Sequence, residues 1–399
     1  MDEDGGVDDR SAAPVLSAVE HEAAESLLGD AWGEPVEVCT AEVVWTRDHV
    51  VRLGTSDGRS AILKRPRQHP HGGRPDLEAF GIELASLEYL AGMPTPVAPR
   101  FLGADVNAGI LLMEELPAGR SLADSLLLGD RAAATADMVA YATALGSVHA
   151  WSIGRTAEFE HTRARYSPAA DPRPWWLGKI ERERGRFLRV ASRFGVVTEG
   201  VDTEIDSLVR MLRGGRYRGF IHGDLCPDNV RLADGRMRIF DFEESSLGSA
   251  ALDAAYLLAP FPSCWCFASV PADIADLAMG AYRSALGASG VEVGDDFDAE
   301  LTAALAGWIV ARATLIERAL KSDRDWGTTT IRPRLVSWTE RFAAAAAATG
   351  TFPRLRIAAE GLHDRFRSLW PIAVVPAYPA LAGPGSTPVR VPGWWEPGL

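Results

Sequence analysis

Three oxygen-bearing side chains follow one another within residues 220–243. Asp224 is followed by Asn229, and Asp241 comes after two apolar strand-like segments joined by an Asp-Gly turn. Phosphoryl transfer needs a carboxylate to orient or deprotonate the attacking hydroxyl, and oxygen ligands to hold Mg²⁺ against nucleotide phosphates. An Asp-Gly turn favours a β-hairpin, which would bring its two ends together. The spacing therefore predicts a phosphoryl-transfer site, although Asp and Asn are also common in ordinary turns.

The residues of this stretch resemble the aminoglycoside phosphotransferase and choline kinase superfamily. The resemblance rests on His222-Gly223-Asp224-Leu225 followed by Asn229, and on Asp241-Phe242-Glu243 in the place of the Asp-Phe-Gly of protein kinases. It implies a protein-kinase-like fold in which Asp224 is the catalytic base and Asn229 and Asp241 are the ligands of Mg²⁺. It also implies that ATP is the phosphoryl donor.

Lys64 is the residue expected to contact the nucleotide phosphates. The chain has only three lysines among its 41 basic residues, and Lys64 ends a predicted strand. At that position the resemblance implies a phosphate-binding lysine that pairs with a glutamate of the following helix. We assign Glu83 as its partner, with Glu78 and Glu88 as competing candidates. The ordinary alternative is a solvated lysine at a sheet edge and a surface carboxylate.

Residues 110–117 resemble the segment that links the two lobes in this superfamily. The resemblance implies that backbone groups of the linker bind adenine, and we place this contact at Glu115 and Leu116. Backbone recognition leaves little side-chain signature. An ordinary edge strand explains the same residues nearly as well.

The hydrophobic pattern changes from strand-like to helical along the chain. Strands are expected at residues 36–38, 43–44, 50–53, 61–63, 100–104 and 109–114. Helices are expected at residues 15–28 with a stop at Gly29, and at 75–90, 138–151, 179–193, 272–286, 301–320, 336–348 and 354–370. This order predicts an α+β, two-lobed fold with a small antiparallel sheet followed by a larger, mainly helical lobe.

The expected domain organisation has four parts. They are a disordered acidic tail at residues 1–13, a nucleotide-binding lobe at 14–115, a catalytic and acceptor-binding lobe at 116–375, and a Pro- and Gly-rich tail at 376–399.

Several residues near the predicted site have two interpretations. Trp175 and Trp176 lie in the 152–219 region, which contributes to the acceptor pocket in related folds. They could stack on a sugar or a cation, or pack between helices. Glu243 and Glu244 could face an acceptor cation or be solvated. We expect His149 to be a core histidine and Asp253 to tie its helix to the catalytic loop.

The phosphate-covering loop departs from the kinase pattern. Kinases use a glycine-rich loop between the first two strands, but the corresponding turn at residues 45–49 has no glycine. The loop residues cannot be assigned from the sequence, although Arg47 is one candidate for a phosphate contact.

Composition narrows the classes of protein to which the chain can belong. A net charge of −13 argues against nucleic-acid binding through a basic patch. No apolar run reaches the length of a membrane span, and the first thirteen residues lack the features of a signal peptide, so we expect a cytoplasmic protein. The four cysteines match no zinc pattern. We interpret them as reduced packing thiols, with a redox or metal role for Cys264 and Cys266 as the alternative.

The function predicted from the sequence is ATP-dependent phosphorylation of a hydroxyl on a small molecule. The acceptor stays open among aminoglycosides, other antibiotics, amino sugars, choline-like alcohols and nucleosides, as does GTP in place of ATP. Nucleotidyl transfer by the same site and a catalytically silent nucleotide-binding module are the alternatives. The oligomeric state has no sequence signature here.

Overall fold

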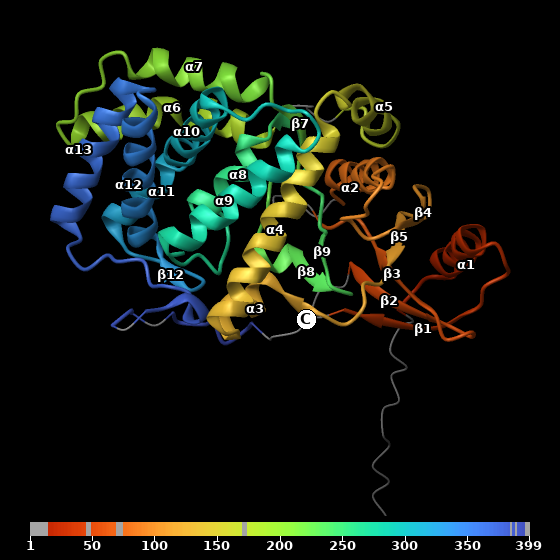
Figure 1. Cartoon of the computed structure of the whole chain (residues 1–399). Coiled ribbons are helices and arrows are strands. Elements are labelled where there is room, and N and C mark those ends of the chain that lie inside the picture. The colour runs from red at the N-terminus through yellow and green to blue at the C-terminus, as the bar shows by residue number, and fades with distance from the viewer. Residues whose placement is uncertain are drawn as a thin grey trace, which may run out of the picture. The chain divides into compact units, whose positions relative to one another are not determined.

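The described chain forms two compact units, which are considered separately (Figure 1). The computed structural model describes residues 15–44, 49–68, 75–169, 174–383, 385–387 and 389–395. The first unit comprises the described part of Met1–Phe80 with Arg100–Glu115, and the second comprises Gly81–Pro99 with the described part of Leu116–Leu399. The sequence-based division at residues 115 and 116 differs from these units in assigning residues 81–99 to the first lobe.

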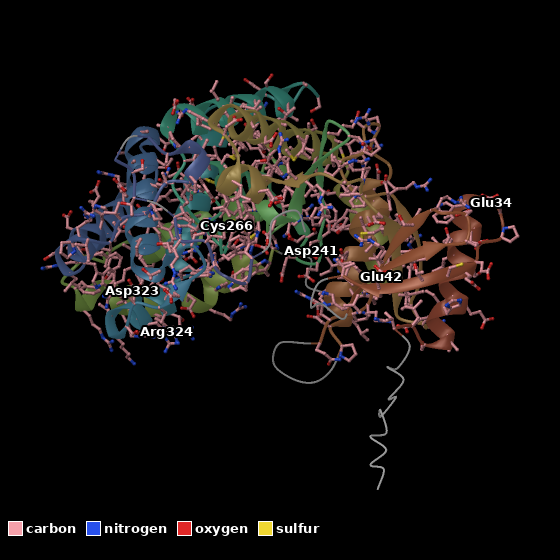
Figure 2. All side chains as sticks on the ribbon, turned by 90° about the horizontal axis from the view of Figure 1, so that it is seen from below. Glu34, Glu42, Asp241, Cys266, Asp323 and Arg324 are labelled. Carbon is pink, nitrogen blue, oxygen red and sulfur yellow. A yellow bond between two sulfur atoms is a disulfide. The ribbon has the colours of Figure 1, made fainter. Side chains whose placement is uncertain are left out.

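An antiparallel sheet forms most of the first unit, with strand order β1-β2-β3-β5-β4. Its strands are β1 (Val38–Val43), β2 (Val50–Thr55), β3 (Ser60–Lys64), β4 (Phe101–Asp105) and β5 (Ile110–Glu114). Alternate residues of the central strands, such as Val51 and Leu53, are fully buried, as expected of a sheet with one face on a core. Glu34 and Glu42, both labelled in Figure 2, are exposed residues of this unit.

Helix α1 (Ala18–Trp32) supplies Ala24 and Leu28 to the core of the sheet. Ser17 caps its first turn, since its side chain accepts from Glu20 N and Glu20 bonds back to the backbone of Ser17. The helix ends at Gly33, whose φ of 76° is the left-handed conformation that favours glycine. The expected stop at Gly29 was therefore wrong by one helical turn.

The second unit is mainly helical, and α2 (Leu77–Leu90) enters it at Gly81. Its helices are α3 (Leu122–Leu128), α4 (Arg131–Ser152), α5 (Thr156–Tyr166), α6 (Trp175–Arg193), α7 (Val201–Arg213), α8 (Ala251–Leu258), α9 (Ala272–Gly287), α10 (Asp295–Val310), α11 (Ala313–Lys321), α12 (Ile331–Thr349) and α13 (Pro353–Leu369). Its short strands are β6 (Arg120–Ser121), β7 (Arg218–Ile221), β8 (Val230–Ala233), β9 (Arg236–Ile239), β10 (Ser246–Ser249), β11 (Asp325–Trp326) and β12 (Thr329–Thr330). The predicted α+β architecture, a small antiparallel sheet followed by a mainly helical part, is confirmed.

One predicted helix is broken in the structure. The sequence pattern gave a single helix over residues 301–320, but α10 ends at Val310 and α11 begins at Ala313 with a bend of 43° between them. No single helix among the described residues is long and apolar enough to cross a membrane; only the bent pair α10 and α11 passes that test together, by length and composition.

Candidate active site

The β8–β9 hairpin brings two predicted metal ligands to the same end of a short ladder. Val230 pairs with Ile239 and Ala233 with Arg236, so the turn contains only Asp234 and Gly235. Both turn residues have positive φ, 50° and 69°, as a two-residue hairpin turn requires. The N–H of Phe240 donates to the carbonyl of Asn229 at 3.0 Å. Asn229 and Asp241 therefore lie at neighbouring ends of the hairpin.

Asp224 starts a compact loop that ends at Asn229. Its carbonyl accepts hydrogen bonds from Cys226 N at 2.9 Å and from Asn229 Nδ2 at 3.0 Å. The Asn229 amide uses its nitrogen in this bond, which leaves the Oδ1 atom as its acceptor. The loop therefore fixes the backbone of Asp224 and the orientation of Asn229 together.

The Asp224 carboxyl group lies in a partly buried, polar environment. Ser263 Oγ donates to its Oδ1 at 2.9 Å and also lies 2.9 Å from the Tyr256 hydroxyl. Burial raises the pKa of Asp224; the negative charge of Asp241 also raises it, whereas the Ser263 hydrogen bond lowers it. A carboxylate with a raised pKa is a stronger proton acceptor, which suits a general base. No sequence pattern indicated Ser263, because it lies 39 residues after Asp224 in the chain.

Asp253 anchors the backbone before the loop. Its Oδ2 accepts from His222 N at 2.7 Å and its Oδ1 accepts from Gly223 N at 3.1 Å. His149 is fully buried, with Nε2 3.3 Å from Asp253 Oδ2 and Nδ1 2.8 Å from the Tyr282 hydroxyl. The expected structural roles of Asp253 and His149 are confirmed.

The residues present fit a magnesium ion. Asn229 and Asp241 offer a carboxamide and a carboxylate oxygen, the hard ligands that Mg²⁺ prefers, and Asp241 (labelled in Figure 2) is close enough to affect the pKa of Asp224. Among the described residues, no group of three or more His, Cys, Asp or Glu side chains could hold a metal alone. An ion at this site would complete its coordination with phosphate oxygens and water, as Mg²⁺ commonly does.

A disulfide joins Cys226 of the loop to Cys264. Trp265 adds a second link, because its Nε1 donates to Asp228 Oδ2 at 2.9 Å. The prediction of reduced thiols was wrong for these two cysteines, whereas Cys39 and the buried Cys266 are free. Pairing across 38 residues depends on the folded arrangement, so cysteine spacing gave no indication of it.

The tryptophan pair of α6 packs against the site. Trp176 is buried, its ring centroid lies 3.9 Å from that of Trp308, and its Nε1 donates to the Gly223 carbonyl at 3.3 Å. Packing between helices is therefore confirmed for Trp176. The residue also contacts the backbone next to Asp224, which the sequence did not indicate.

The remaining predicted site residues lie in separate parts of the chain. Lys64 ends β3 of the first unit, where it pairs with Val50 and with Leu111 of β5. Glu83 is buried on the part of α2 that belongs to the second unit. Lys64 and Glu83 thus belong to different units, and their pairing stays a prediction.

The predicted linker residues fall at the boundary of the units. Glu115 is the last residue of the first unit and accepts from Arg52 Nε at 2.6 Å, and Leu116 begins the second segment of the other unit. The phosphate-covering loop at residues 45–49, including Arg47, lies outside the described residues except for His49.

The chain belongs to the phosphotransferase enzyme family, because the model of that family matches residues 43–290, more than half of the sequence. None of the curated proteins matches the chain. The family resemblance drawn from the residues around Asp224 is thus confirmed.

Solved structures of related enzymes are similar at low identity. A choline kinase from Streptococcus pneumoniae is 15% identical, with 82% of this chain and 98% of that chain covered and a TM-score of 0.42. An aminoglycoside phosphotransferase from Alicyclobacillus acidocaldarius is 14% identical, with 90% and 99% covered and a TM-score of 0.44. A choline kinase from Cryptosporidium parvum is 13% identical, with 85% and 93% covered and a TM-score of 0.44.

Proposed function

We propose that this chain transfers the terminal phosphoryl group of ATP to a hydroxyl group of a small molecule. The observation that carries the proposal is the Asp224 loop, in which an anchored, partly buried carboxylate with a raised pKa adjoins Asn229 and Asp241. Family membership supports the reaction class. The structures of choline and aminoglycoside kinases suggest the acceptor type, a hydroxylated small molecule.

In this mechanism Asp224 accepts the proton of the acceptor hydroxyl as its oxygen bonds to the γ-phosphorus. The bond between the γ-phosphorus and its bridging oxygen to the β-phosphate breaks, and ADP leaves with that oxygen. The Ser263 hydrogen bond holds the Asp224 carboxylate in one orientation before and after proton transfer. Asp253 keeps the preceding backbone fixed, so the carboxylate stays within reach of the reacting oxygen.

Asn229 and Asp241 are proposed to hold Mg²⁺. A bound Mg²⁺ would neutralise charge on the β- and γ-phosphate oxygens. Lys64, with Glu83 as its partner, is proposed to position the phosphates, and the backbone at Glu115 and Leu116 to bind the adenine ring. These assignments follow the family resemblance.

The test is turnover of a panel of hydroxylated metabolites and antibiotics with Mg²⁺ and either ATP or GTP. Mass spectrometry of the product distinguishes an added phosphoryl group from an added nucleotidyl group. Asp224→Ala should lower kcat by roughly 10²- to 10⁴-fold, the usual contribution of a general base.

Asp234→Asn is the matched control, because Asp234 is an exposed carboxylate in the turn of the same hairpin. Asparagine tolerates positive φ, so this variant should retain full activity. Equal kcat values for Asp224→Ala and the wild type would contradict the proposed base. Nucleotide binding without turnover of any acceptor would favour the silent-module alternative.

A further inference from the structure

Arg312 lies in the break between α10 and α11, surrounded by aromatic rings. Its guanidinium carbon lies 4.7 Å from the ring centroid of Trp176 and 5.3 Å from that of Trp308. Two further rings, Trp326 and Trp338, lie at 5.1 Å and 5.9 Å. Such contacts favour a cation through the negative faces of the rings. They supply no acceptor for its N–H groups.

Arg312 has no anionic partner in hydrogen-bond contact within the described chain. Its Nε atom is buried without a hydrogen-bond partner, and no ion pair or hydrogen bond joins its other nitrogens to a described residue. Burial lowers its pKa to about 10, although the charges of Tyr256 and Asp224 oppose this effect. The Arg312 side chain is half-buried, and a cation that loses part of its hydration without gaining an acceptor costs free energy, so such groups normally have a partner.

A second buried arginine shows the usual solution. Arg334 donates to the carbonyls of Cys264 at 2.9 Å and of Trp326 at 2.7 Å, and its guanidinium also faces the Trp326 ring. Backbone carbonyls thus accept from both terminal nitrogens of Arg334, although its Nε atom, like that of Arg312, is buried without a partner. Arg312 differs from it in its terminal nitrogens, for which no described residue supplies an acceptor.

Lys179 places a second cation on the same tryptophans. Its Nζ lies 5.2 Å from the Trp175 ring centroid and 5.0 Å from that of Trp176. Burial lowers its pKa to about 8, and the charge of Arg312 lowers it further, so the two cations lie near each other. Glu183 partly offsets this effect, but its carboxylate is already bonded to Thr314 and Arg186.

The β11–β12 hairpin holds one wall of this aromatic cluster in place. Asp323, which is exposed and labelled in Figure 2, accepts from Thr330 Oγ1 at 2.7 Å and from Arg332 N at 3.1 Å. Thr328 N donates to the Trp265 carbonyl at 2.8 Å. Gly327 has a φ of 70°, and an added Cβ would lie 1.9 Å from that same carbonyl. The wall that carries Trp326 is therefore closely fitted to the segment next to Ser263.

We propose that Arg312 and Lys179 bind an anionic group, a carboxylate, on the acceptor whose hydroxyl faces Asp224. The inference rests on the proposed phosphotransferase function and narrows its substrate class. Trp176 contacts Arg312 and also donates to the Gly223 carbonyl next to Asp224, so a single small molecule can present its carboxylate to Arg312 and its hydroxyl to Asp224. A polycationic acceptor such as an aminoglycoside is disfavoured at this site, because two cations would repel it.

Equilibrium binding measurements test the proposed carboxylate site independently of catalysis. The probes are two matched sets, glycerate with glycerol and 3-amino-1,2-propanediol, and gluconate with glucitol and 1-amino-1-deoxyglucitol. Within each set the carbon skeleton is the same and only the terminal group changes, from a carboxylate to a neutral hydroxymethyl or a cationic aminomethyl group. Trp176, Trp308 and Trp326 border Arg312, so tryptophan fluorescence of the full chain without nucleotide reports binding.

The carboxylates should bind more tightly than their neutral counterparts, and the amines most weakly. Arg312→Gln should weaken carboxylate binding about tenfold or more, as expected when a charged hydrogen-bond donor is lost. Lys179→Gln should weaken it less, and it provides an independent measurement should Arg312→Gln fail to fold. Arg318→Gln is the control, because Arg318 is an exposed arginine of α11, the helix that follows Arg312, and this variant should leave binding unchanged.

Kinetics distinguish anion binding from tuning of the base. If Arg312 binds the acceptor, its loss raises KM for carboxylated acceptors and leaves the pH profile of kcat in place. An equal fall of kcat for all acceptors, or no preference of the wild type for carboxylates, overturns the inference. Carboxylate binding that depends on Arg312 without any turnover supports the inference and contradicts the proposed phosphotransferase function.

Discussion

Asp253 controls the position of the catalytic loop through two backbone N–H groups. Its carboxylate oxygens accept from His222 N and Gly223 N, and the residue is almost fully buried. Removing an acceptor of buried donors costs about 1–3 kcal/mol for each donor left without a partner. The loop that carries Asp224 therefore depends on a residue that takes no part in the chemistry.

Asp253→Ala should lower the free energy of unfolding by about 3 to 5 kcal/mol, because two N–H groups and His149 lose their acceptor. Asp253→Asn retains one carbonyl oxygen and should lose roughly half as much. Chemical denaturation measures both, with the exposed Asp276→Ala of α9 as a control. Equal stability of the alanine variant and the wild type would contradict the anchoring role.

At the scale of single residues, the sequence predicted those site residues that lie close together along the chain. Asp224, Asn229 and Asp241 follow each other along one loop and hairpin, so their order predicts their proximity. Ser263 and Arg312 reach the same site from distant elements. Their proximity to Asp224 depends on tertiary packing, which cannot be predicted from the type and position of a single residue.

Two elements meet at the disulfide between the catalytic loop and the segment that follows α8. Cys226 lies two residues after Asp224, and Cys264 directly follows Ser263, which bonds to the Asp224 carboxylate. The covalent link therefore restricts the separation of the two segments that define the environment of the base.

Loss of this disulfide should lower the free energy of unfolding by about 3 to 4 kcal/mol, because the bond closes a loop of 38 residues in the unfolded chain. Cys264→Ser, or the wild type with reductant, is compared with the oxidised wild type by chemical denaturation. Cys39→Ser is the control, since Cys39 is exposed and free. Identical midpoints with and without reductant would show that the bond does not form in solution.

Sequence patterns predicted the existence of most elements and misplaced some of their ends. The β8–β9 hairpin follows directly from its Asp-Gly turn and flanking apolar residues. The break between α10 and α11 could not be predicted in this way. Residues 301–320 keep an apolar helical pattern and contain no proline. The break is set by packing, and it is the feature that places Arg312 among the tryptophans.

For the whole molecule, the buried Glu300 links stability to pH. Glu300 lies on α10 and accepts a hydrogen bond from Ser249 of β10. Burial, with a smaller effect of the Asp296 charge, raises its pKa from 4.5 to about 7. Since the folded state holds this proton more tightly than the unfolded state, its stabilising contribution is complete below about pH 4.5 and is lost as the pH rises through about 7.

Glu300→Gln keeps the oxygen that accepts from Ser249 and removes the charge. We expect this variant to be more stable than the wild type at pH 8 by about 1 to 2 kcal/mol, a value reduced for solvent screening. At pH 5 the two proteins should have similar stability. Thermal unfolding at both pH values measures the stability difference between the variant and the wild type. A variant that is equally destabilised at pH 5 and pH 8 would contradict the predicted pH dependence.

Gly327 offers a way to sort relatives of this chain by the acceptor that they use. The tight approach of its backbone to the Trp265 carbonyl leaves no room for a side chain, so a bulkier residue there would displace the neighbouring tryptophan. Homologues that combine glycine in this turn with arginine at the helix break should form one subgroup of shared specificity. Homologues that lack both should have diverged toward uncharged or positively charged acceptors, which makes the pair a marker for choosing enzymes to assay together.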